Sequence, residues 1–280
     1  MRRKASQVNR DVDRYVGLSL GGPRSDRTAL TVIDYYKKQQ KAFIIDVYES
    51  IAAHDHFTAD EVLLDIIQEL GEQVSIIAVD APLTLPPCAL GCAKDCRGYT
   101  TCRRPAVLWM RNQHRKAKAR NPKLKWFAPY VQRPVDLYYR HQNPGVDLMQ
   151  DDTLGANLAP QAARMQYLKS HLPSGVGLIE VWPKLAVLQS HGALDISRDE
   201  ALSYRHMEEG ASIREDILAS IADTSGLFLY ERDVKKYAQN MAAFDSLVCA
   251  WVALLKGLHR CAPTPKGVPV ESGWVELPSL

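Results

Sequence analysis

The stretch that decides the fold is VSIIAVDAPLTLP, residues 74–86. Its first six residues, 74–79, form a nearly continuous apolar run, which is typical of a strand buried on both faces of a sheet. Asp80 ends this run, and prolines stop regular structure directly after it. A second apolar run at residues 176–181 contains Glu180. Both runs predict an α/β protein in which acidic residues lie on buried strands, near their ends.

Periodic patterns on either side of these two runs complete the expected fold. Further strands are expected at 15–20, 29–33 and 43–48, and helices at 60–70, 157–171, 183–191, 208–222 and 233–258. The order of three strands, helix, strand, insertion, helix, strand and helices is that of a ribonuclease-H-like fold, a mixed five-stranded sheet flanked by helices. We expect a discontinuous core (14–83 and 157–260), a Cys-rich basic insertion (84–156) and an irregular tail (261–280).

Composition limits the class of protein. The chain has 280 residues, of which 46% are hydrophobic and 24% are charged, values that exclude a disordered or fibrous protein. The net charge of +3 does not by itself indicate nucleic acid. The basic N-terminus lacks the apolar segment of a secretory signal, and the longest apolar run, 247–255, is shorter than the roughly 20 residues of a membrane span. We therefore expect a cytoplasmic protein with reduced thiols and no membrane partner; the oligomeric state stays open.

Three acidic residues occupy positions where a charge is costly. Asp80 and Glu180 lie on the two buried strands or at their ends, and Asp245 is the lone charge of a long apolar helix. A buried carboxylate needs a partner or a bound cation. Each acid alone is also explained by an ordinary ion pair or cap. The three together favour a shared site, because carboxylates from separate elements hold the Mg²⁺ or Mn²⁺ ions of phosphodiester hydrolysis.

Four sequence pieces resemble a known family. They are YVGLSLGG (15–22), AVDAPLTLP (78–86), IEVWPKLAVL (179–188) and AAFDSLVCAWVAL (242–254), within a similarity that spans about 15–260. The family is domain-of-unknown-function family four-two-nine, described as predicted nucleases with a ribonuclease-H fold. The resemblance implies acids on the first strand, the fourth strand and the last helix. It therefore implies a metal-site role for Asp80 and Asp245, with Glu180 close by.

One position departs from the family pattern. The first strand usually carries an Asp, and the matching residue here is Ser19. A hydroxyl is a poorer Mg²⁺ ligand than a carboxylate. Asp26 could substitute only if the hairpin folds back. The chain is thus weakly active, uses different chemistry or is inactive.

Four of the six cysteines, Cys88, Cys92, Cys96 and Cys102, lie within fifteen residues. Four thiolates this close can hold one tetrahedral Zn²⁺ or one iron–sulfur cluster. The gaps of three, three and five residues match neither a zinc ribbon nor a ferredoxin, so the identity of the metal stays open. The alternatives are free thiols or two local disulfides.

Residues 97–135 carry eleven Lys and Arg side chains and no Asp or Glu, with aromatic residues between them. Basic groups neutralise phosphates, and aromatic faces stack on unpaired bases. We therefore expect Arg111, Arg115 and Arg133 to contact a nucleic-acid substrate. The alternatives are a solvated basic helix and, for Arg133, a structural ion pair with Asp136.

Three functions follow as hypotheses. The first is a metal-dependent nuclease that uses Asp80, Glu180 and Asp245. The second is a ribonuclease-H-like scaffold with a degraded site that binds nucleic acid or protein, which Ser19 favours. The third is an actin-like phosphotransferase, for which a second phosphate loop is missing. We favour the first hypothesis.

Overall fold

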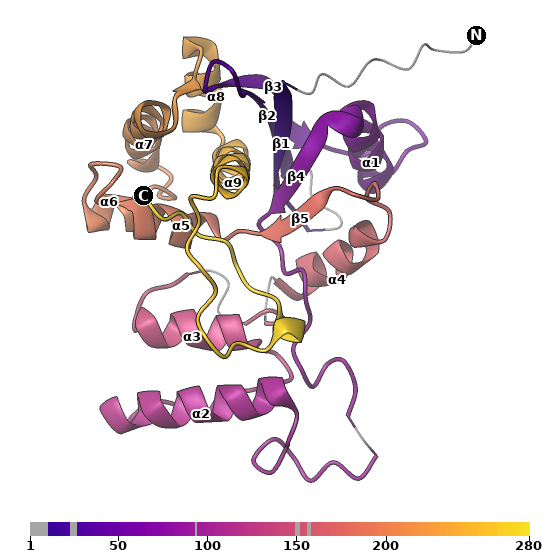
Figure 1. The fold of residues 1–280 in the computed structure, drawn as a ribbon, viewed down its shortest axis with the longest axis vertical. Helices are drawn as coiled ribbons and strands as arrows, with labels where there is room; N and C mark the ends of the chain where they lie inside the picture. The colour runs from indigo at the N-terminus through magenta and orange to yellow at the C-terminus, as the bar shows by residue number, and fades with distance from the viewer. Residues whose placement is uncertain (1–10, 23–26, 93, 149–151, 156–157) are drawn as a thin grey trace. The chain divides into compact units, whose positions relative to one another are not determined.

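The computed structural model describes residues 11–22, 27–92, 94–148, 152–155 and 158–280. Its contacts divide the chain into two compact units. Unit 1 comprises residues 1–80, 171–261 and 276–280, and unit 2 comprises 81–170 and 262–275. The range 84–156, expected as an insertion, lies within unit 2. Figure 1 shows the elements of both units, each of which is considered by itself below.

A mixed sheet forms the centre of unit 1. Its strands are β1 (Val12–Ser19), β2 (Thr28–Tyr36), β3 (Lys41–Ile51), β4 (Val74–Val79), β5 (Gly177–Glu180) and β6 (Leu227–Phe228), in the order β5-β4-β1-β2-β3-β6. β1, β4 and β5 run parallel, whereas β1, β2 and β3 form an antiparallel meander. The mixed α/β fold is thus confirmed.

The expected number of five strands is wrong, because the described residues form a six-stranded sheet. The additional strand, β6, is two residues long and pairs in parallel with β3. It follows Gly226, whose φ of 61° ends the preceding helix and whose carbonyl accepts the N–H of Ala42 at 3.1 Å. Two residues are too few to give an alternating pattern, which explains why the sequence did not indicate this strand.

Six of the helices belong to unit 1. They are α1 (Ala59–Glu69), α5 (Pro183–Ser190), α6 (Arg198–Ser203), α7 (Gly210–Ser225), α8 (Glu231–Gln239) and α9 (Met241–Gly257), with a short 3₁₀ turn at Gly71–Gln73. Reciprocal hydrogen bonds between Thr58 and Glu61, and between Ser197 and Glu200, fix the starts of α1 and α6. α9 is buried almost throughout and packs on β1, β2 and β4 (Figure 1).

The single helix expected at 233–258 is two helices. Asn240 separates them, because its extended backbone (φ −110°, ψ 108°) cannot continue α8. Its side chain accepts the N–H groups of Ala242 and Ala243 and so caps α9. Among the described residues no single helix is long and apolar enough to cross a membrane, and α8 and α9 reach that length only together, across a bend of 116°.

Gly17 lets α9 approach the sheet closely. A Cβ atom on Gly17 would lie 2.0 Å from the carbonyl oxygen of Ser246 and 2.2 Å from the backbone nitrogen of Ala250. Both are backbone atoms of a buried helix, so they cannot rotate away. The hydroxyl groups of Thr31 and Ser246, 2.7 Å apart, fix the same helix to β2. The position of every α9 side chain over the sheet therefore depends on a glycine at position 17.

We expect Gly17→Ala to lower the free energy of unfolding by at least roughly 3 kcal/mol, because the helix must move to admit a methyl group. Chemical denaturation measures this loss. Gly22→Ala is the matched control, since a Cβ there meets nothing within 4 Å. Equal stability of the two variants would contradict the packing described here.

Unit 2 contains α2 (Pro105–Arg120), α3 (Pro134–Gln142), α4 (Leu158–Lys169) and a 3₁₀ turn at Val270–Ser272. Its apolar cluster consists of Met110, Phe127 and Leu137, with Tyr99 and Trp109 packed against them. Ring contacts join Trp274, from the C-terminal part of the chain, to Trp109, Tyr138 and Tyr139. Side chains from α2, α3 and the adjoining loops thus form a core of their own.

Candidate functional site

Asp80 directly follows β4 and faces the end of β1. Its N–H continues the strand pairing by donating to the carbonyl of Leu18 at 3.1 Å. Its carboxylate accepts the Ser19 hydroxyl at 2.8 Å and the Leu20 N–H at 2.7 Å. Ser19, which replaces the acid expected on the first strand, therefore binds Asp80 directly. Asp26 lies outside the described residues.

Asp245, on the buried helix α9, is paired with two residues that follow α6. Tyr204 donates its hydroxyl to Oδ1 of Asp245 at 2.9 Å, and the guanidinium of Arg205 binds Oδ2. Arg205 also donates to the Tyr204 hydroxyl at 3.1 Å, which fixes the orientation of all three groups. The charge of Asp245 is thus compensated by a cation.

The two carboxylates lie within electrostatic range of one another. Burial raises the pKa of Asp80 to about 7, and the charge of Asp245 adds to this rise; the Leu20 N–H, the Ser19 hydroxyl and Arg205 oppose it. Burial also raises the pKa of Asp245, against the attraction of Arg205. Arg214 contributes a further attraction for Asp245 while donating to backbone carbonyls. Arg205 therefore acts on both acids, and its interaction with Asp245 is stronger than its interaction with Asp80.

Sequence reasoning missed Tyr204 and Arg205. They lie in a short polar segment with no periodic pattern. Arg205 is 40 residues before Asp245 in the sequence. The available signal was indirect: a lone acid in an apolar helix requires a partner. No pattern in the sequence could say which of the many arginines supplies it.

Glu180 reaches the same edge of the sheet. As the last residue of β5 it pairs with Val79, the residue before Asp80. Its side chain is buried, and its Oε1 accepts the indole N–H of Trp182 at 2.8 Å. The strands therefore bring Glu180 near the end of β4, with its carboxylate bound to a neighbour on its own segment.

The donor atoms of this site suit a hard divalent cation. Among the described residues, no three His, Cys, Asp or Glu side chains are close enough together to hold a metal ion as they stand. The donors at the end of β4 are nonetheless all oxygens, which Mg²⁺ and Mn²⁺ prefer. Carboxylate oxygens have two lone pairs each, so one oxygen can accept a hydrogen bond and ligate a cation at the same time. A bound cation would also oppose the repulsion between Asp80 and Asp245.

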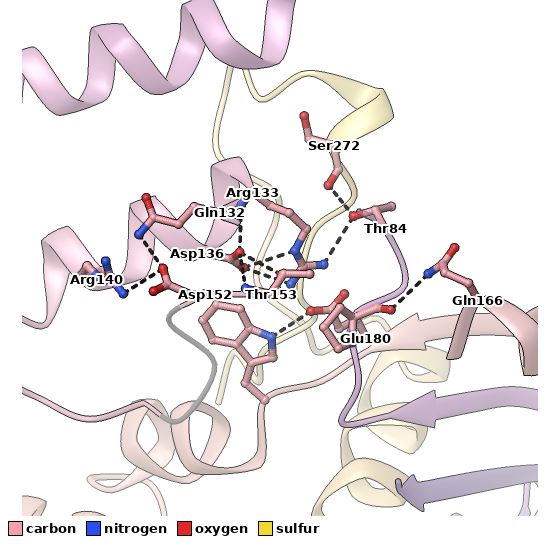
Figure 2. A network of polar contacts seen from close by, with 12 residues as sticks. Thr84, Gln132, Arg133, Asp136, Arg140, Asp152, Thr153, Gln166, Glu180 and Ser272 are labelled. Atoms are coloured by element: carbon pink, nitrogen blue, oxygen red, sulfur yellow. Dashed lines mark hydrogen bonds and ion pairs between the residues drawn. The ribbon is translucent and has the colours of Figure 1, made fainter. Parts of the chain in front are cut away.

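Arg133, in unit 2, forms a buried ion pair. Its side chain is 1% exposed, and its guanidinium binds Oδ1 of Asp136 at 3.0 Å. Asp136 also accepts the N–H and the hydroxyl of Thr153, and Arg133 donates to the Thr84 hydroxyl (Figure 2). This arrangement is the structural ion pair that the sequence also allowed, in place of a surface contact for substrate.

The other two predicted substrate contacts, Arg111 and Arg115, lie on α2. Arg111 donates to the carbonyls of Tyr99 and Thr100, whereas Arg115 is exposed and bonded to Asn112 at 2.9 Å. Both line a surface pocket of about 500 Å³. The remaining residues of this basic–aromatic pocket are Thr100, His114, Lys118, Ala119 and Trp126.

Trp126 gives the basic–aromatic pocket an exposed ring face. Its side chain is 60% exposed and stacks on the buried His114, with ring centroids 5.2 Å apart and planes inclined by 26°. The ammonium group of Lys118 lies 4.8 Å from the Trp126 ring. An aromatic face beside cations is the arrangement that binds unpaired bases and their phosphates.

The four clustered cysteines lie in the loop before α2, and all are free thiols. Burial raises the pKa of Cys88 to about 11, with further contributions from Cys92, Cys102 and Cys96. The four thiols are therefore close enough to influence one another. Cys249, by contrast, is buried in α9.

The comparisons with known proteins identify a family. A family model described as "Protein of unknown function (DUF429)" matches residues 25–268. No curated protein and no solved structure gives a significant match. The matched range includes Asp80, Glu180 and Asp245 and covers most of the chain. This protein therefore belongs to the DUF429 family of proteins of unknown function.

Proposed function

We propose that this protein is a metal-dependent phosphodiesterase that acts on nucleic acid, with Asp80 and Asp245 as its principal acids. The observation that carries the proposal is their convergence: Asp80, directly after β4, and Asp245, on α9, are 165 positions apart, yet they lie within electrostatic range of one another and both interact with Arg205. A protein that needs only stability gains little from placing the half-buried Asp80 within electrostatic range of the buried Asp245, because each carboxylate raises the cost of ionising the other.

The topology supports a ribonuclease-H-like core for this activity. Setting aside the two-residue β6, the strands lie in the order β3-β2-β1-β4-β5, with the meander antiparallel and the rest parallel. In the family resemblance this fold has acids on the first strand, the fourth strand and the last helix. Ser19, Asp80 and Asp245 occupy the corresponding elements here.

Each side chain has a distinct task in this proposal. Asp80 and Asp245 would hold Mg²⁺ or Mn²⁺, and Glu180 lies at the adjacent strand end. Such an ion, when bound, supplies an activated water and neutralises charge on the phosphate. Ser19 and the Leu20 N–H keep the Asp80 carboxylate in one orientation. Arg205, whose side chain is 17% exposed, balances Asp245 and would pair with a phosphate oxygen once released from it.

The basic–aromatic pocket of unit 2 supports a nucleic-acid substrate. Trp126 offers a stacking face, and Arg115 and Lys118 offer charges for phosphates. Stacking on an aromatic residue needs an unpaired base, so a single strand is the favoured substrate.

Cleavage of labelled oligonucleotides tests the proposal. Single-stranded DNA, single-stranded RNA, a duplex and a hybrid are each incubated with the protein and Mg²⁺ or Mn²⁺. We expect metal-dependent cleavage of single strands, loss of cleavage in Asp245→Asn and full cleavage in Asp46→Asn, which changes an exposed acid on β3. No cleavage of any substrate by the parent protein would overturn the proposal.

A second function, nucleic-acid binding by a degraded site, is favoured by Ser19 and by the ion pair between Asp245 and Arg205. It predicts binding that weakens with salt and no turnover. Arg115→Ala and Trp126→Ala would reduce that binding. Ser19→Asp would then restore the missing acid, and gain of cleavage in this variant alone would identify the parent as a degraded nuclease.

A further inference from the structure

The loop that carries the four clustered cysteines has no core of its own. We call residues 88–102 the cysteine loop, of which 93 lies outside the described residues. The described part contains turns but no helix or strand, and its apolar residue Leu90 is 58% exposed. Ordering each residue of such a loop costs about 1–2 kcal/mol of backbone entropy. Tyr99 packs against the apolar cluster of unit 2, but the described residues from 89 to 98 are all exposed. Buried apolar area does not offset the cost in that segment, so another interaction must do so.

Hydrogen bonds from α2 and its N-terminal cap hold the loop at several points. Arg104 donates to the carbonyls of Pro87 and Gly91, both at 2.7 Å. Arg111 donates to the carbonyls of Tyr99 and Thr100. These bonds bring the two halves of the cysteine loop toward one another, but they give no comparable anchor to the described residues between Gly91 and Tyr99.

The thiols face a common space. Cys92, Cys96 and Cys102 line one open pocket of about 730 Å³, and the thiol of Cys88 lies close enough to Cys92 for the two groups to influence one another. As they stand, no three of them are close enough together to hold an ion, so binding requires the loop to draw them inward. Gly91 and Gly98, with φ of 94° and 93°, flank the segment that must move. Glycine permits such backbone changes at little cost.

Cations surround the same pocket. Arg97, Arg103 and Arg104 line it, together with a single acid, Asp95. Four thiolates around one Zn²⁺ carry a net charge of about −2, which these arginines would balance. The charge distribution therefore suits a tetrathiolate metal site.

We propose that Cys88, Cys92, Cys96 and Cys102 bind one Zn²⁺ ion that closes the cysteine loop. Each thiol releases its proton to solvent as it ligates the metal, and no oxidant or reductant is needed. The ion would supply the cross-link that the segment between the two glycines lacks. The site is separate from the carboxylates at the end of β4, and its presence does not depend on phosphodiesterase activity.

Metal analysis of the full-length protein, purified under reducing conditions, tests this assignment. We expect about one zinc per chain in the parent and in Cys261→Ser, which removes a thiol outside the loop. Cys92→Ser and Cys96→Ser are expected to lose at least roughly four fifths of the zinc. Both residues are exposed, so serine is tolerated sterically and a loss of metal reports ligation.

Two further measurements complete the test. Limited trypsin digestion is expected to cleave at Lys94 or Arg97 at least about tenfold faster in Cys96→Ser than in the parent, because the loop opens. Titration of the zinc-depleted parent with Co²⁺ is expected to give thiolate charge-transfer absorbance. The assignment is overturned by four freely reactive loop thiols without zinc, by iron with sulfide, or by full zinc content in both loop variants.

Discussion

Asp80→Asn is expected to abolish metal-dependent cleavage and, at the same time, to make the protein more stable above pH 7. The loss of cleavage should be roughly 10²–10³-fold or greater, because a charged group aimed at the reacting centre is removed. The gain in stability follows from the cost of ionising Asp80 near Asp245. A carboxylate that serves only the fold would give the opposite change in stability.

The sign of the stability change follows from the pKa of Asp80. Burial and Asp245 raise it from an ordinary value of 3.8 to about 7, so the folded protein holds a proton that the unfolded chain releases in this range. Stability therefore falls as the pH rises from about 4 to about 7 and stays level above. Asparagine has no proton to lose. The variant should match the parent near pH 4 and exceed it at pH 8 by at most about 4 kcal/mol.

Thermal melts at pH 4.5 and pH 8 in the presence of a chelator check this prediction, with Asp46→Asn as the control. Adding Mn²⁺ at pH 8 should raise the melting temperature of the parent and leave that of Asp80→Asn unchanged. A variant that is less stable than the parent at pH 8 would show that Asp80 is an ordinary structural acid.

Arg133→Met is expected to destabilise unit 2 by about 3–5 kcal/mol. Among the proposed variants, this is the second largest effect that we expect. Methionine keeps the length of the side chain but removes its charge. Asp136, which is 0% exposed, would then remain buried without the cation that now binds it, although Thr153 and the backbone N–H of residue 133 would still donate to it. A buried carboxylate that loses its cation either takes up a proton or forces the surrounding loop open.

Urea denaturation measures this loss, and Arg140→Met is the matched control. Arg140 is 35% exposed and binds Asp152 at 3.0 Å, so its removal should cost less than about 1 kcal/mol. If Arg133→Met instead keeps full stability and weakens only nucleic-acid binding, Arg133 contacts substrate as the sequence first indicated.

The sequence predicted those parts of the fold that a local pattern encodes. β4 and the acid that follows it could be identified because a nearly continuous apolar run of six residues, followed directly by Asp80, has one reasonable structural explanation. The meander and α9 also follow from local periodicity. β6 could not be identified, since two residues are too few to show a periodic pattern. The break at Asn240 could not be identified either, since a single polar residue is also common inside a helix.

Which residues make up the site depends on contacts between residues that are distant in sequence. Asp80 and Asp245 were indicated because each is an isolated charge among apolar residues. Arg205 was not, because its role arises only when the segment that follows α6 meets α9 in unit 1. For Arg133 the sequence allowed both a surface contact and a buried pair with Asp136, and tertiary burial decides between them.

Binding of Mn²⁺ tests the central claim, that Asp80 and Asp245 serve one divalent ion, most directly. The free ion is followed by electron paramagnetic resonance, and Mn²⁺ is suitable because it prefers oxygen ligands to thiolates. We predict binding by the parent and by Asp46→Asn, and at least about tenfold weaker binding by both Asp80→Asn and Asp245→Asn. Equal binding by all four proteins, or none by the parent, would contradict a shared metal site at the end of β4.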